Sequence, residues 1–308
     1  MALREPLTRL RHVVSSEQFH TEELAALFAR AEALDGVRDQ RLSQRIMASL
    51  FYEPSTRTRL SFESAMLRLG GSILGTEAAH TFSSAIKGET LEDTVRMVST
   101  YADIIVLRHD QQGAAARAAA VATVPVINAG DGPGEHPTQA LLDLFTIQRE
   151  VGHIDGVSIA FCGDLRFGRT ARSLALLMAQ YPGVRFIFVA PPVVQVGADI
   201  IARLDERRVP YTLTDSLRDV IGDVDVVYQT RVQRERFTDP SEFEQANSAF
   251  RIDRNLMRLL RPDAVLMHPL PRVDEIASEV DSDPRAAYFR QAANGVTIRM
   301  ALLDTLLW

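Results

Sequence analysis

Short, fully apolar runs alternate with amphipathic stretches along this chain of 308 residues, and this alternation limits its fold more than any other feature. Runs that are apolar along their whole length indicate strands buried on both faces. We predict strands at residues 45–51, 103–108, 124–129, 157–163, 185–190, 225–230 and 264–268. We predict helices at residues 21–34, 57–69, 90–101, 113–121, 137–151, 170–180 and 284–307, the last with a break. The alternation indicates an α/β fold of two doubly wound parallel sheets with helices on both faces.

The length of the chain indicates two domains, because 308 residues exceed what one small core usually supports. The helix predicted at 137–151 ends near Gly152, and a new strand follows it. We therefore place the boundary near residue 150, with predicted domains at 1–150 and 151–283.

Composition narrows the class of protein. Hydrophobic residues make up 46% of the chain and charged residues 24%, a balance typical of a soluble globular protein. No apolar run approaches the roughly 20 residues of a membrane helix, and the N-terminus does not read as a secretion signal. The net charge of −6 argues against a nucleic-acid partner, and the single cysteine, Cys162, excludes an internal disulfide. We predict a cytoplasmic protein without membrane or nucleic-acid partners.

The segment at residues 53–59, EPSTRTR, is the sharpest motif in the sequence. Pro54 ends the preceding strand, and a serine or threonine after it can cap the following helix. Backbone N–H groups of the first helical turn, together with hydroxyls and guanidinium groups, form a cup suited to phosphate. Taken alone, the segment also fits a well-capped helix with surface arginines.

Other distinctive polar residues follow further predicted strands. Ligands of open α/β sheets bind beyond the carboxyl ends of the strands, so this recurrence predicts a binding site there. The residues at these strand ends are Arg108, His136, Arg169, Arg231 and His268.

Three of these motifs resemble those of the aspartate/ornithine carbamoyltransferase family. They are the run from Ser55 to Thr58, the run from His136 to Gln139, and Arg108. The resemblance implies that the phosphate of carbamoyl phosphate is held by Ser55, Thr56, Arg57, Thr58 and Arg108. It places His136 and Gln139 at the carbamoyl end, and it gives the catalytic roles to Arg57, Thr58, Arg108 and His136. It also implies that the C-terminal helix, residues 284–308, packs back on the first domain.

The second half of the chain resembles the aspartate-using branch of this family. Arg169 and Arg231 match positions that bind the two carboxylates of aspartate, and two fixed guanidinium groups would repel a cationic amino acid such as ornithine. Pro269 stands where ornithine-using enzymes typically carry cysteine. The implied aspartate-binding residues are Lys87, Arg169, Arg231, Gln233, Leu270 and Pro271. The implied reaction is carbamoyl transfer to L-aspartate, an early step of de novo pyrimidine biosynthesis.

Ser83 and Lys87 match residues that aspartate-using members insert into the active site of a neighbouring subunit. The resemblance therefore implies a homotrimer with shared active sites. Read without the family, Lys87 is an ordinary solvated lysine. No metal and no other cofactor is implied, whereas a regulatory chain or another pathway partner stays an open question.

Two other interpretations compete with this one. Residues 163–170, GDLRFGRT, differ from a nucleotide-binding P-loop by an arginine in place of its lysine. A catalytically silent homologue that serves as a scaffold is the second alternative, but the motif residues named above are all present.

Overall fold

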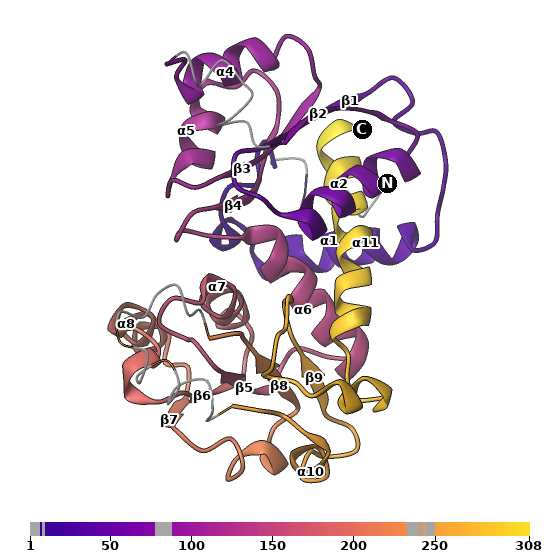
Figure 1. Ribbon diagram of the computed structural model, residues 1–308. Helices are drawn as coiled ribbons and strands as arrows, with labels where there is room; N and C mark the ends of the chain where they lie inside the picture. The colour runs from indigo at the N-terminus through magenta and orange to yellow at the C-terminus, as the bar shows by residue number, and fades with distance from the viewer. Residues whose placement is uncertain (1–6, 8–9, 78–87, 233–238, 240–242, 244–249) are drawn as a thin grey trace. The chain divides into compact units, whose positions relative to one another are not determined.

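The computed structural model describes residues 7, 10–77, 88–232, 239, 243 and 250–308. The chain divides into two compact units. The first comprises Met1–Leu141 together with Asn294–Trp308, and the second comprises Leu142–Ala293. The division falls inside the two long helices α6 (Pro137–Val151) and α11 (Tyr288–Leu307), and the boundary predicted near residue 150 lies at the end of α6 (Figure 1).

The first unit contains a four-stranded parallel sheet in the order β2-β1-β3-β4. Its strands are β1 (Ile46–Phe51), β2 (Ser72–Glu77), β3 (Ile104–His109) and β4 (Val126–Asp131). The chain passes from β1 to β2 on one side and then crosses to β3 and β4 on the other. The order therefore reverses between β1 and β3, and this switch point is where ligands of open α/β sheets bind.

Helices cover both faces of this sheet. They are α1 (Thr21–Leu34), α2 (Thr56–Arg68), α4 (Leu91–Val98) and α5 (Ala114–Val121), and α4 and α5 lie together on one side (Figure 1). On that face, alternate strand residues such as Leu50 and Leu107 form one apolar cluster with Val95 of α4 and Ala118 of α5. Predicted and observed helices agree here to within a few residues at their ends.

The C-terminal part of α11 belongs to the first unit, as the sequence predicted. Asp304 is buried in it and forms ion pairs with Arg30 of α1 and with Arg41, at 3.1 Å for Arg41. The guanidinium group of Arg299 lies 4.9 Å from the centre of the Phe62 ring in α2. These contacts hold the end of the chain against the helices that cover the first sheet.

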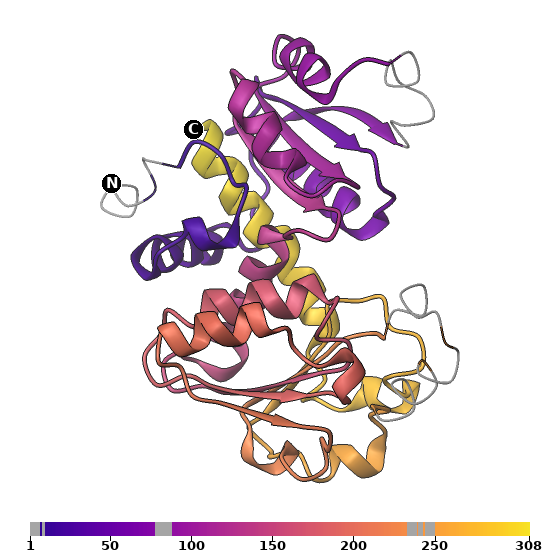
Figure 2. The ribbon, with the colours of Figure 1, turned by 90° about the vertical axis from the view of Figure 1, so that its left-hand side faces the viewer.

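The second unit contains a five-stranded parallel sheet in the order β7-β6-β5-β8-β9. Its strands are β5 (Ser158–Cys162), β6 (Arg185–Val189), β7 (Tyr211–Thr214), β8 (Val226–Gln229) and β9 (Val265–Met267). The helices α7 (Arg169–Met178) and α8 (Ala198–Glu206) pack together on one side, and α10 (Arg254–Met257) lies on the other (Figure 2). Here the strand order reverses between β5 and β8.

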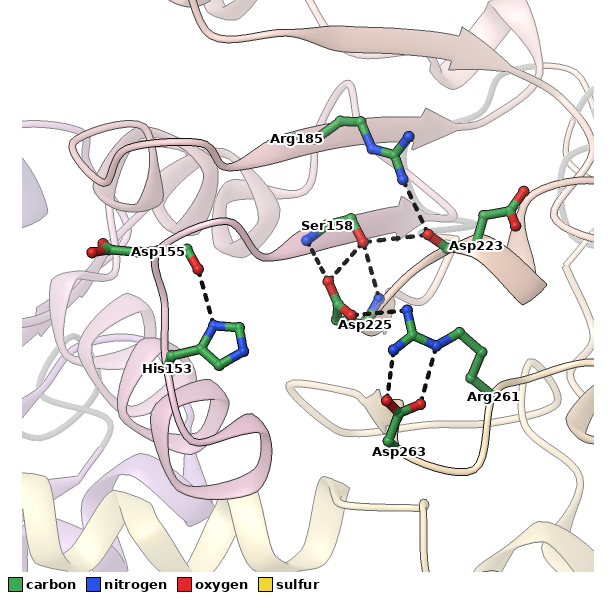
Figure 3. A network of polar contacts seen from close by, with 8 residues as sticks. All are labelled: His153, Asp155, Ser158, Arg185, Asp223, Asp225, Arg261 and Asp263. Carbon is green, nitrogen blue, oxygen red and sulfur yellow. Dashed lines mark hydrogen bonds and ion pairs between the residues drawn. The ribbon is translucent and has the colours of Figure 1, made fainter.

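A polar network ties together the amino ends of β5 and β8, opposite the switch point (Figure 3). One carboxylate oxygen of Asp225 accepts hydrogen bonds from the backbone N–H and the hydroxyl of Ser158, each at 2.7 Å. Its other oxygen accepts a hydrogen bond from Arg261 at 3.1 Å, and Arg261 also pairs with Asp263. Arg261 is thus paired with two acidic side chains at this end of the sheet.

Among the described residues, four strands and α-helices were absent from our sequence prediction: strands β2 and β7, and helices α8 and α10. Both strands lie at sheet edges, and β7 is exposed at its two central residues, so neither shows the continuous apolar pattern of the inner strands. Short 3₁₀ helices at Ser16–Gln18, Pro192–Val194, Ile221–Asp223 and Ser278–Ser282 connect the larger elements. The last of them precedes α11, which begins at Tyr288 instead of at residue 284.

Candidate functional site

The segment at 53–59 forms the loop after β1 and the first turn of α2. Ser55 is the N-cap residue, but its side chain makes no capping hydrogen bond, and Arg59 N–H donates the first helical bond to its carbonyl at 3.0 Å. The hydroxyl of Ser55 is therefore not used for capping. The N–H groups of Thr56, Arg57 and Thr58 precede the first residue that can bond within the helix, so this turn has the donors an anion requires.

Thr58 and His136 lie close together in the first unit. The Thr58 hydroxyl is 3.5 Å from Nε2 of His136, and both residues are buried, with 8% and 5% of their surface exposed. The loop before His136 is held firmly, since Asp131 accepts a hydrogen bond from the N–H of Glu135 at 2.8 Å. The carboxylate of Glu135 accepts a further hydrogen bond from the N–H of Ser16 at 2.8 Å. A polar pair is thus placed beside the turn that begins α2.

Arg108 is buried at the carboxyl end of β3, on the other side of the switch point from α2. Its Nη1 donates to the carbonyl oxygen of Ala129 at 3.1 Å, and its Nη2 lies 2.8 Å from a carboxylate oxygen of Glu53. Glu53 is the first residue of the motif at 53–59, and the sequence predicted no role for it. An incoming phosphate would have to share Arg108 with this carboxylate or replace it.

Arg57 differs from its neighbour Arg59, which pairs with Glu63 at 2.8 Å. Within the described residues Arg57 forms no ion pair, and it is exposed. The protein around its guanidinium group still displaces enough water to lower the pKa of Arg57. An arginine without a carboxylate partner at the start of a helix suits an anionic ligand.

In the second unit, two close backbone approaches shape the switch point. A β-carbon at Gly163 would lie 2.3 Å from the carbonyl oxygen of Thr230, and one at Gly168 would lie 2.3 Å from that of Asp164. Both positions therefore require glycine. The first contact fixes the end of β8 just before Arg231, and the second fixes the start of α7 just before Arg169. The two predicted carboxylate-binding arginines thus follow neighbouring parallel strands.

Leu270 and Pro271 lie in the loop after β9. Leu270 has a φ of 54°, in the left-handed region that residues other than glycine seldom adopt, and its peptide bond to Pro271 is cis. The N–H of Leu270 donates to Nδ1 of His268 at 2.8 Å, so the histidine supports the loop from within.

The remaining predicted residues are placed as follows. Gln139 is half-buried in the first turn of α6, and its N–H donates to the carbonyl of His136 at 3.0 Å. Ser83, Lys87 and Gln233 lie outside the described residues. Cys162 is fully buried in β5, and burial raises the pKa of its thiol far above the usual value, so the thiol stays protonated.

The described residues contain no group of three or more histidine, cysteine, aspartate or glutamate side chains that could hold a metal ion. In the same part of the chain, no helix is long and apolar enough to cross a membrane.

Comparison with known proteins places both halves of the chain in one family. Residues 11–149 match the sequence model of the "Aspartate/ornithine carbamoyltransferase, carbamoyl-P binding domain", and residues 155–306 match that of the "Asp/Orn binding domain". The chain is 53% identical over 305 residues to aspartate carbamoyltransferase 1, chloroplastic, of Pisum sativum, covering 97% of this chain and 79% of the relative. It is 48% identical over 304 residues to the catalytic subunit of aspartate carbamoyltransferase from Thermoplasma acidophilum, covering 96% and 98%.

Solved structures agree with these relatives. Aspartate transcarbamoylase from Trypanosoma cruzi in complex with carbamoyl phosphate superimposes with a TM-score of 0.93 at 41% identity and covers 100% of both chains. The catalytic subunit from M. Jannaschii superimposes with a TM-score of 0.91 at 44% identity and covers 96% of this chain and 98% of its own.

Proposed function

The chain belongs to the aspartate/ornithine carbamoyltransferase family, and we infer that it transfers the carbamoyl group of carbamoyl phosphate to the α-amine of L-aspartate. Relatives over its full length, at about half identity, are aspartate carbamoyltransferases, and the chain has their activity. The products are N-carbamoyl-L-aspartate and phosphate, which places the reaction in pyrimidine biosynthesis.

We propose that the first unit binds carbamoyl phosphate at its switch point. The observation that carries this proposal is the arrangement around α2: an uncapped first turn, Arg57 without an ion-pair partner among the described residues, and Arg108 across the switch point. Ser55, Thr56 and Gln139 complete the proposed site. With the phosphate held there, Thr58, Arg108 and His136 are the groups we assign to the carbonyl oxygen of the carbamoyl group.

These assignments give each residue a chemical role. The amine of aspartate attacks the carbamoyl carbon, an oxyanion forms on the carbonyl oxygen, and the bond to phosphate breaks. Donors directed at that oxyanion lower the barrier, and the loss of one typically costs about 10²–10³ in rate. We assign no protein base, because the departing phosphate can accept the proton of the amine.

We propose that the second unit binds aspartate through Arg169 and Arg231, with Gln233, Leu270 and Pro271 beside them. Support comes from the position of both arginines at the β5–β8 switch point, where glycine contacts fix the adjoining backbone. Two guanidinium groups match the two carboxylates of aspartate. Substrates that are both anionic also require a cationic site within a protein whose net charge is −6.

A colorimetric assay for carbamoyl products tests the proposed reaction directly. The purified chain with carbamoyl phosphate should form product with L-aspartate and none with L-ornithine at equal concentration. Product with ornithine, or none with either amino acid, would contradict the assignment. The second outcome is the one that a catalytically silent scaffold would give.

We propose further that the enzyme is a homotrimer in which Ser83 and Lys87 act in the site of a neighbouring subunit. The match of both residues to the family motif supports this. Mixing inactive Lys87→Ala chains with inactive Arg57→Ala chains should restore activity, because hybrid rings contain some intact sites. The absence of recovery after subunit exchange has been verified by mass spectrometry would contradict shared sites.

We also propose a cytoplasmic location for the enzyme and its association with a regulatory chain or pathway partner. A single buried cysteine fits a reducing compartment, although the plant relatives are named chloroplastic. Fractionation of source cells tests the location, and activity outside the cytosol would contradict it. Size-exclusion chromatography of the active fraction tests the partner, and a mass equal to the trimer alone would contradict a stable complex.

A further inference from the structure

A line of buried polar side chains runs through the second unit to the loop that carries Leu270. The Tyr228 hydroxyl of β8 donates to Oδ2 of Asp143 at 2.6 Å. Oδ1 of Asp143, on α6, accepts a hydrogen bond from Nε2 of Gln291 at 2.6 Å. The amide oxygen of Gln291, on α11, accepts one from the backbone N–H of His268 at 2.8 Å. All four residues are at most 1% exposed, so no water replaces a lost partner.

The imidazole of His268 continues the line into the loop. Its Nδ1 accepts the N–H of Leu270 at 2.8 Å, so the proton of the neutral ring lies on Nε2, which donates to Glu275 at 2.8 Å. The other oxygen of Glu275 accepts the N–H of Val273 at 3.0 Å. Desolvation by burial raises the pKa of Glu275, but the hydrogen bonds from His268 and the backbone outweigh it, and the pKa is lowered overall. The loop backbone is thus bonded at residues 268, 270 and 273.

Each hydrogen bond of the line fixes the orientation of the next. Gln291 must turn its oxygen to the N–H of His268, so its NH₂ group faces α6 and needs an acceptor there. A carboxylate at position 143 accepts from Gln291 and from Tyr228 at once, which few side chains of this size can do. Because these side chains are buried, removal of any member takes a hydrogen bond from its neighbour that water does not replace.

We propose that Gln291 and Asp143 are positioning residues for aspartate, acting through His268 on the backbone of Leu270 and Pro271. This inference rests on the proposed function, which places those two residues at the aspartate site. The line holds a left-handed loop backbone in one conformation, and a loop displaced by about 1 Å can lower the efficiency of catalysis by about 100-fold. The binding of phosphate by the first unit does not depend on it.

Matched variants separate positioning from a purely structural role. Gln291→Met keeps the length and packing of the side chain and removes both hydrogen bonds. Asp143→Asn still accepts from Gln291, and its NH₂ group can donate to the Tyr228 oxygen once that hydroxyl turns, so it should preserve the line. Asp143→Leu cannot do either. Gln148→Leu, at an exposed position of the same helix α6, is the control for a glutamine replaced by an apolar residue.

The experiment measures the KM for aspartate, kcat, the Kd for inorganic phosphate and the melting temperature of each full-length variant. Gln291→Met and Asp143→Leu should raise the KM for aspartate about 10- to 100-fold. The Kd for phosphate should stay within about twofold, and Asp143→Asn and Gln148→Leu should stay within about 1.5-fold of wild type in every constant.

Tyr228→Phe removes only the far hydroxyl and should fold even where the other variants do not. It should raise the KM for aspartate about threefold. If the wild type is active and Gln291→Met folds but keeps the wild-type KM for aspartate, the inference is overturned and the proposed function stands. A parallel loss of phosphate affinity would also overturn it, because that loss indicates general damage. If Gln291→Met does not fold, an unchanged KM for aspartate in Tyr228→Phe would overturn it. A wild type that forms no carbamoyl aspartate would overturn the proposed function itself.

Discussion

The two sheets of this molecule share one plan and differ in how they use it. In each, the chain builds strands to one side of the first strand and then crosses to the other, so a switch point opens between β1 and β3 and again between β5 and β8. In the first unit the polar groups at that point are donors on a helix start and on two arginines. In the second unit they are the guanidinium groups of arginines and backbone groups of loops. Close glycine–carbonyl approaches and the hydrogen bond from Leu270 to His268 hold these loops. The topology fixes the place for a ligand, and the side chains decide which ligand.

The two sites should therefore be sensitive to different kinds of substitution. The first site depends on charge, because Arg57 has no ion-pair partner among the described residues and Arg108 shares its charge with Glu53. The second depends on loop geometry as well as charge, since Gly163 and Gly168 each approach a carbonyl oxygen too closely for a β-carbon and Leu270 has a left-handed backbone.

Arg57→Ala should have the largest effect. Loss of a charge directed at the phosphate, which is the leaving group, should lower kcat/KM for carbamoyl phosphate about 10³-fold. Arg59→Ala is the matched control, because Arg59 lies on the same helix but pairs with Glu63. Steady-state kinetics should show Arg59→Ala within about threefold of wild type. Equal losses of kcat/KM in the two variants would mean that activity depends on positive charge near α2 in general and not on Arg57 in particular.

Arg169→Ala should come next and should affect the other substrate. Removal of one bidentate carboxylate contact should raise the KM for aspartate about 100-fold and leave the Kd for phosphate unchanged. Arg172→Ala, on the same helix, removes an arginine that pairs with Asp199 and should leave both constants near wild type. Calorimetric titration with phosphate and kinetics with aspartate provide the two readouts. A weaker affinity for phosphate in Arg169→Ala would contradict the assignment of phosphate binding to the first unit and aspartate binding to the second.

The glycine contacts give a third, smaller prediction. In Gly168→Ala the new methyl group would meet the carbonyl oxygen of Asp164 at 2.3 Å, so the start of α7 must shift. We expect the KM for aspartate to rise about tenfold and stability to fall by about 1–3 kcal/mol. Gly75→Ala in β2 of the first unit finds no atom closer than 3.7 Å and should change neither constant. Urea unfolding and kinetics of both variants check this, and a wild-type KM in Gly168→Ala would contradict the geometric account.

The smallest effect is on the pH dependence of stability in the second unit. Despite desolvation by burial, hydrogen bonds from His268 and the backbone hold the folded-state pKa of Glu275 below its usual value of about 4.5. Its contribution to stability is therefore present above about pH 4.5 and is lost as pH falls through the folded pKa. Wild type should therefore lose more stability on acidification than Glu275→Gln. Urea unfolding at about pH 7 and about pH 3.5 measures the difference. Identical acid sensitivity in the two proteins would contradict it.

Much of this architecture could be predicted from the sequence, because strands buried on both faces leave an unmistakable apolar pattern. The loops that carry Arg57 and Arg169 were predicted as well, since each lies between a predicted strand and the body of a predicted helix. The edge strands β2 and β7 were missed, because half-exposed strands carry a mixed pattern.

Long-range polar partners were also missed. Glu53 faces Arg108 across 55 positions of sequence, and Asp143 meets Gln291 across 148. Nothing in the local pattern around an acidic residue indicates which distant donor it will meet. The buried line to His268 therefore became visible only once the fold had brought α6, α11 and β8 together in the second unit.

The assignment of phosphate binding to the first unit and aspartate binding to the second is tested most directly by a crystal structure. The chain would be crystallised with N-(phosphonacetyl)-L-aspartate, which joins a phosphonate to an aspartate group. Our account predicts the phosphonate oxygens at about 3 Å from donors of Arg57, Thr58 and Arg108, and the carboxylates at the same distance from Arg169 and Arg231. Phosphonate bound instead by the P-loop-like segment at residues 163–170 would contradict it.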